Sequence, residues 1–139
     1  MTTEGGCLCK SVRFAVEGEP LVTRVCWCRL CQYLSGGNGM VSVCFRSEGL
    51  NISGKVHWFE SIADSGNRME RGFCRTCGTP LFSKTEARPH LVFIRAGSLD
   101  NPNVIAPQQA IWTKEAPGWA CISPDIPQIT DQPSPPRPV

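Results

Sequence analysis

Seven of the nine cysteines of the chain lie in three short clusters. The clusters are Cys7 with Cys9, then Cys26 with Cys28 and Cys31, then Cys74 with Cys77. Cysteines this close in sequence are awkward disulfide partners, because a disulfide requires a particular separation and orientation of its two Cβ atoms. Thiolates from such clusters can instead converge on one Zn²⁺ ion. The spacing therefore predicts a metal-binding protein with two zinc ions per chain.

The seven thiols divide naturally into four and three. A structural zinc ion takes four ligands at about 2.3 Å, whereas a reactive one has three protein ligands and an open position. The middle cluster supplies three ligands within six residues, which leaves the two outer pairs for each other. Joining those pairs closes a long loop and removes much entropy from the unfolded chain. We expect a structural zinc on Cys7, Cys9, Cys74 and Cys77, and a second, reactive zinc on Cys26, Cys28 and Cys31.

A fourth protein ligand would make the middle cluster a structural site rather than a reactive one. His57, His90, Cys44 or Cys121 could close that site and make it structural, and the chain would then be a non-catalytic zinc-binding structural or interaction module. Free cysteines are most often small buried hydrophobic residues, and a lone histidine in a strand is usually a packing or surface residue. The reactive interpretation therefore stands beside the structural one, and thiol binding to the middle cluster distinguishes them.

Composition limits the remaining function classes. No apolar run approaches the roughly 20 residues that span a bilayer, and a net charge of +2 is too small to indicate a nucleic-acid or membrane partner. The first six residues lack the basic and apolar regions of a secretory signal. An odd number of cysteines cannot all pair, which suits a reducing compartment. We expect a soluble, cytoplasmic protein.

Hydrophobic alternation along the chain is that of short strands. Strands are expected at 12–16, 20–26, 40–45, 56–59, 79–83 and 90–96. Glycine, asparagine and serine clusters between these runs predict turns, and no segment has a sustained helical period. The sequence thus predicts one all-β domain over 1–130. The proline-rich segment 131–139 has few apolar residues and is expected to be a disordered tail.

Three ordered motifs resemble one known family. They are Gly6-Cys7-Leu8-Cys9 followed by Val12-Arg13-Phe14, Cys26-Trp27-Cys28-Arg29-Leu30-Cys31, and Phe73-Cys74-Arg75-Thr76-Cys77-Gly78. In order and spacing they resemble the glutathione-dependent formaldehyde-activating enzymes, a family that includes centromere protein V. Ile111-Trp112, Ala116-Pro117, Trp119 and Ile126-Pro127 resemble its C-terminal segment, so the likeness covers roughly 4–129.

The resemblance implies an Mss4-like zinc fold, or β-tent, with the same division of cysteines into a structural and a catalytic zinc site. It implies the condensation of the glutathione thiol with formaldehyde to S-(hydroxymethyl)glutathione, a carbon-sulfur lyase reaction in reverse. The chain departs from the family where histidines are usual, with Trp27 inside the middle cluster and Ala110 before Ile111-Trp112. The partners are thus expected to be a small-molecule thiol, glutathione or a related one, and an aldehyde or another electrophile. Arg24 and Arg29 are the nearest candidate cations for offsetting thiolate charge or pairing with substrate carboxylates.

Overall fold

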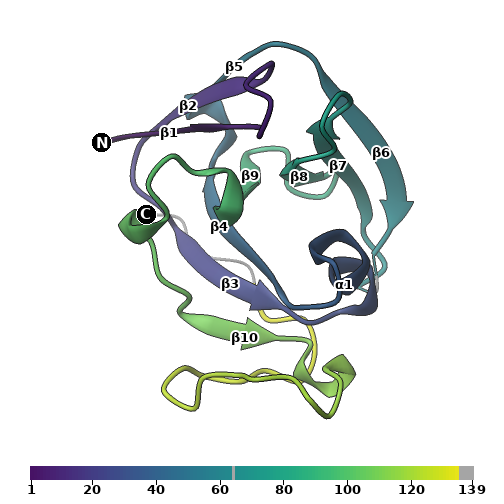
Figure 1. The fold of residues 1–139 in the computed structure, drawn as a ribbon. Helices are drawn as coiled ribbons and strands as arrows, with labels where there is room; N and C mark the ends of the chain where they lie inside the picture. The colour runs from purple at the N-terminus through teal and green to yellow at the C-terminus, as the bar shows by residue number, and fades with distance from the viewer. Residues whose placement is uncertain (64, 135–139) are drawn as a thin grey trace.

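The computed structural model describes residues 1–63 and 65–134, which form two β-sheets of unequal size (Figure 1). The small sheet has the strand order β1-β2-β5, and the large sheet has the order β10-β3-β4-β9-β8-β7-β6. The strands are β1 (Thr2–Gly6), β2 (Arg13–Glu17), β3 (Val22–Cys26), β4 (Met40–Arg46), β5 (Leu50–Ser53), β6 (Val56–Ile62), β7 (Arg68–Cys74), β8 (Pro80–Thr85), β9 (Leu91–Arg95) and β10 (Gln109–Ile111). The fold is all-β, as the sequence predicts.

Short helices connect the strands within the described ranges. One is an α-helix, α1 (Arg29–Ser35), and the others are the 3-10 helices η1 (Ser47–Gly49), η2 (Ala96–Ser98), η3 (Pro102–Val104) and η4 (Thr113–Glu115). The sequence pattern does not indicate α1, because seven residues make only two turns and cannot display a helical period. Cys28 caps its start and Gly36, with a φ of 84°, ends it.

One face of the large sheet carries polar side chains. Side chains alternate between the two faces along each strand, so strand register decides which residues lie together. Across β3, β4 and β9 the paired residues are Arg24, Ser42 and Arg95. Across β7, β8 and β9 they are Arg71, Ser83 and Phe93. Because Phe93 and Arg95 are two residues apart on β9, both rows belong to the same face.

The opposite face of the large sheet forms the hydrophobic core with the small sheet. Phe14 of β2 packs edge-on against Phe82 of β8, with ring centroids 5.2 Å apart. Val43 and Ile94 of the large sheet and Val16 of β2 are completely buried in this core. The large sheet therefore separates an apolar core from a polar face that is available for a site.

The six strands predicted from alternation are confirmed as β2, β3, β4, β6, β8 and β9. Strands β1, β5, β7 and β10 are additional. Strand β1 contains Gly5 and Gly6, β10 has only three residues, and β7 is rich in charged residues, so none of these three strands alternates clearly.

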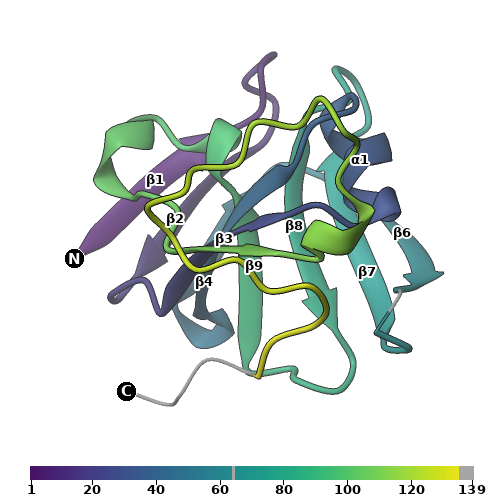
Figure 2. The same cartoon turned by 90° about the horizontal axis from the view of Figure 1, so that it is seen from below.

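A C-terminal segment runs across the β3 and β10 end of the molecule (Figure 2). Gln128 forms a parallel bridge with Ala110 of β10, and the Trp112 indole N–H donates to Gln132 Oε1 at 2.9 Å. Arg24 donates to the carbonyl oxygen of Ser134 at 3.0 Å. The first residues of the predicted tail thus lie against the domain, while 135–139 lie outside the described residues. Among the described residues, no helix has the length and apolar character needed to cross a membrane.

Candidate metal centres

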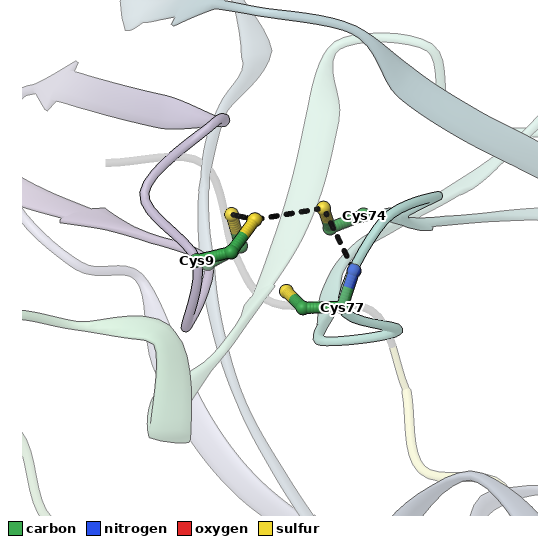
Figure 3. Close-up of side chains that lie close together, drawn as sticks. Cys9, Cys74 and Cys77 are labelled. Atoms are coloured by element: carbon green, nitrogen blue, oxygen red, sulfur yellow. Dashed lines mark hydrogen bonds between the residues drawn. The ribbon is translucent and has the colours of Figure 1, made fainter.

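The two outer cysteine pairs meet in space. The Sγ atoms of Cys7, Cys9, Cys74 and Cys77 all lie within 4.8 Å of one another. Cys9 Sγ is 3.6 Å from Cys7 Sγ and 3.7 Å from Cys74 Sγ (Figure 3). Four sulfurs placed tetrahedrally at a zinc-sulfur distance of 2.3 Å would be about 3.8 Å apart. The group could therefore hold a metal ion with little rearrangement.

Two tight turns present these four thiols. Cys7 and Cys9 lie between β1 and β2, where Lys10 adopts the left-handed conformation with a φ of 67°. Cys74 ends β7 and Cys77 lies in the turn before β8, where Gly78 has a φ of 78°. Because one turn belongs to the small sheet and the other to the large sheet, a metal ion here would join the two sheets.

Hydroxyl groups stabilise the thiolate form of this group. Thr79 Oγ1 lies 3.1 Å from Cys77 Sγ, and hydrogen bonding from this hydroxyl lowers the pKa of Cys77 to about 5. Ser11 Oγ lies 3.3 Å from Cys74 Sγ, and the same effect lowers the pKa of Cys74. Metal binding requires deprotonated thiols, so both hydroxyls favour a loaded site near neutral pH.

The three cysteines of the middle cluster form a second group around the start of α1. Cys26 ends β3, Cys28 caps α1 and Cys31 lies in its first turn, and their Sγ atoms are all within 4.8 Å of one another. The Cys31 amide donates to Cys28 Sγ at 3.4 Å. Hydrogen bonding from Cys26, together with that from Cys31, lowers the pKa of Cys28 to about 3. The same contact with Cys28 raises the pKa of Cys26, so the group favours one thiolate in the absence of metal.

A buried glutamine anchors the loop that carries this group. The Gln32 amide donates to the carbonyl oxygens of Trp27 at 2.7 Å and Glu115 at 3.0 Å. The Glu115 carboxylate in turn accepts from the Arg29 backbone N–H at 2.7 Å. These bonds tie α1 to η4 and fix the cysteine loop between them.

The middle group has three ligands. Within 1–63 and 65–134, no histidine, further cysteine or carboxylate joins it. The four candidate fourth donors are elsewhere: His57, His90 and Cys121 are exposed, and Cys44 is fully buried in β4. Three thiols with no fourth protein ligand match the pattern of a metal site that keeps one position for a substrate.

A pocket opens beside the three-cysteine group on the polar face of the large sheet. The space open to a water-sized sphere is about 120 Å³. Apolar walls come from Met40, Phe93, Ile111 and Trp112, and four arginines, Arg24, Arg71, Arg88 and Arg95, also line the pocket. Arg24, which the sequence suggests as a cation near the second zinc site, lines this pocket together with the three cysteines. Arg29 does not line the pocket, because its side chain is exposed over the Tyr33 ring and donates to Gln32.

Three of the pocket arginines have no clear sequence signal. Arg71 is in a charged stretch that has no visible period, and Arg88 is in a loop. Arg95 ends the apolar run Leu91–Arg95, and a charge at the end of such a run is the one signal that could have revealed it. Only strand register places Arg71 and Arg95 near the cysteines.

Comparison with known proteins places the chain in a family. Residues 2–115 match the model of the family described as glutathione-dependent formaldehyde-activating enzyme, abbreviated GFA. The chain belongs to the GFA family. Its fold is similar to the crystal structure of a Rhodobacter sphaeroides protein, with a TM-score of 0.57 and 21% sequence identity over 75% of this chain and 94% of that chain. No curated protein that was compared matches the chain.

Two positions at which GFA enzymes usually have histidine lie outside the pocket lining. Trp27 is 2% exposed and packs close to Gly39, and Ala110 is completely buried in β10. The neighbouring residues Cys26, Cys28 and Ile111 line the pocket. Within the described residues the lining of this GFA chain therefore contains no imidazole, although it includes the hydroxyls of Ser42 and Ser83.

Proposed function

We propose that this GFA-family chain is a zinc-dependent enzyme of the carbon-sulfur lyase type. It holds a structural zinc ion on Cys7, Cys9, Cys74 and Cys77 and a reactive zinc ion on Cys26, Cys28 and Cys31. The reaction joins the thiol of glutathione, or of a related small molecule, to an aldehyde such as formaldehyde. The observation that carries the proposal is the three-thiol group at the pocket, which no fourth ligand from the described residues completes.

Bound zinc would lower the pKa of a substrate thiol and orient its sulfur toward the aldehyde carbon. In the condensation a sulfur-carbon bond forms and the carbonyl π bond opens onto oxygen. The thiol proton finishes on that oxygen, so atoms and charge balance without any redox partner. The same steps in reverse give the lyase direction.

The protein's own residues set the conditions for this reaction. Met40, Phe93 and Trp112 limit water near the cysteines, which strengthens the electrostatic interactions inside the pocket. Three thiolates around a divalent ion carry a formal charge of −1, so a further thiolate would be repelled without nearby cations. Arg95 and Arg71 supply such cations, since both line the pocket with the cysteines.

The test is zinc stoichiometry with a glutathione titration. Elemental analysis of anaerobically purified protein should give two zinc ions per chain, and zinc-edge X-ray absorption should detect an added sulfur neighbour as glutathione is titrated. Cys28→Ser is the matched variant, and it should retain one zinc ion and lose the response. Two zinc ions, neither of which gains a sulfur neighbour from glutathione or related thiols, would contradict the proposal and favour a structural zinc module.

A further inference from the structure

The pocket beside the three-cysteine group has an unusual excess of buried positive charge. Arg24, Arg71 and Arg95 are each 6–8% exposed, and the half-buried Arg88 lies at the same pocket. Moving a charged side chain out of water is costly unless an opposite charge or strong hydrogen bonds compensate for it. Three buried guanidinium groups at one small pocket therefore require an explanation.

Protein groups compensate these charges only in part. The partners of the three buried guanidinium groups are neutral: Arg95 donates to Ser42 Oγ at 2.7 Å, Arg71 to Ser61 Oγ, and Arg24 to Gln109 Oε1 at 2.9 Å. Within the described residues, the buried Nε atoms of Arg71 and Arg95 have no hydrogen-bond partner. Among the described residues, none of the four arginines forms a salt bridge.

The cysteines do not balance the remaining charge. A zinc ion with three thiolates has a net charge of −1, and a substrate thiolate on the same ion brings this to −2. Four guanidinium groups carry +4, so an excess of about two positive charges remains even with that thiolate present. The lining residues in the described ranges include no aspartate or glutamate. No carboxylate of the described lining offsets this charge, and a bound acidic ligand would offset it.

Strand register spreads the buried arginines over the polar face. Arg24 of β3 and Arg95 of β9 lie in one row on either side of Ser42 of β4. Arg71 lies on β7, on the far side of β8, so three strands separate β3 from β7. Guanidinium groups that project from separate strands suit separate acidic groups, since each guanidinium can bind a carboxylate with two parallel hydrogen bonds.

We propose that this pocket binds a compact dicarboxylate, with one carboxylate toward Arg24 of β3 and the other toward Arg71 of β7. The small open volume favours a short carbon skeleton. Glutathione is a tripeptide, so a compact thiol diacid fits this volume better. That this ligand is also the thiol substrate rests on the proposed function, whereas anion binding by the arginines does not.

A series of small thiols that differ in charge tests the proposal. Isothermal titration calorimetry of the zinc-loaded protein would compare mercaptosuccinate, 3-mercaptopropionate, 2-mercaptoethanol and cysteamine. Mercaptosuccinate should bind at least about tenfold more tightly than 2-mercaptoethanol, because charge-assisted hydrogen bonds are worth about that factor or more, and cysteamine should bind most weakly. Equal affinity across the series would overturn the proposal.

Succinate and inorganic phosphate separate this inference from the proposed reaction. Succinate should bind and should compete with mercaptosuccinate, and phosphate should bind more weakly because its single anionic group cannot reach Arg24 and Arg71 together. If mercaptosuccinate binds no better than succinate, the arginine site stands and the thiol chemistry of the proposed function fails. Phosphate binding more tightly than succinate would overturn the proposal of two separate carboxylate positions.

Arginine variants complete the test. Arg95→Gln should weaken succinate binding by about tenfold or more, and Arg88→Gln, at a half-buried position that tolerates change, should weaken it as well. Arg68→Gln is the matched control, because Arg68 is on the same strand as Arg71 but is exposed and pairs with Glu86. Unchanged succinate affinity in both pocket variants, with zinc content and folding intact, would overturn the proposal.

Discussion

Ser11 and Thr79 distinguish the two cysteine groups at the scale of single residues. Their hydroxyls contact all four sulfurs of the four-cysteine group, at 3.7 Å from Cys7, 3.1 Å from Cys9, 3.3 Å from Cys74 and 3.1 Å from Cys77. The middle group has no hydroxyl contact of this kind among the described residues, and it faces a pocket instead. One group is hydrogen-bonded by hydroxyls of the protein, while the other borders a pocket.

Two serine substitutions should therefore have different effects. Cys77→Ser should unfold or aggregate the protein, because structural zinc binding is worth on the order of 10 kcal/mol of folding free energy. Cys28→Ser should give a folded domain with one zinc ion fewer, since serine is also a good helix cap at that position. Circular dichroism and zinc analysis of both variants would test this. Equal loss of structure in the two would refute the division into structural and reactive sites.

At the scale of elements, the turn between β5 and β6 packs against Ser11, beside the four-cysteine group. Gly54 has a φ of 95°, and a Cβ atom there would lie 2.1 Å from the carbonyl oxygen of Ser11. Ser11 in turn contacts the sulfurs of Cys9 and Cys74. The glycine thus allows one turn to lie directly against the loop that carries the metal ligands.

Gly54→Ala tests this close approach. The substitution should lower the free energy of unfolding by more than about 2 kcal/mol, because it combines left-handed backbone strain with a clash against backbone. Gly18→Ala is the control, since Gly18 has a φ of 105° but open space around its Cα, so it should cost only about 1 kcal/mol. Denaturant unfolding of the zinc-loaded variants measures both. Equal costs would mean that backbone conformation, and not contact with Ser11, determines the effect.

The strands show most clearly which parts of the structure can be predicted from the sequence. Alternation reveals strands such as β4 and β9, whose apolar side chains fill the core. It does not reveal β1, which ends in two glycines, or β10, which has only three residues. Cysteine spacing predicts the two groups of thiols that the structure brings together, because metal ligands leave a strong local pattern in the sequence. The arginines of the pocket leave no such pattern, because Arg71 and Arg95 line the same pocket only through the register of a seven-stranded sheet.

At the scale of the whole molecule, the C-terminal segment forms one rim of the pocket. Gln132 lines the pocket and accepts a hydrogen bond from the Trp112 indole, and the Ser134 carbonyl accepts one from Arg24. The core formed by the two sheets does not include this segment. The segment should therefore influence the pocket much more than it influences folding.

Deletion of residues 132–139 tests this separation. It should lower the free energy of unfolding by only about 1–3 kcal/mol, the usual net value of two lost hydrogen bonds, and leave zinc content unchanged. Tryptophan emission should shift to the red as Trp112 loses its partner and becomes hydrated, and the same deletion in a Trp112→Phe background should give no shift. Deletion of 135–139 alone is the control, because it retains both hydrogen bonds. A loss of folding after the longer deletion would mean that the segment belongs to the structural core, whereas an unchanged emission spectrum would mean that it does not cover the pocket.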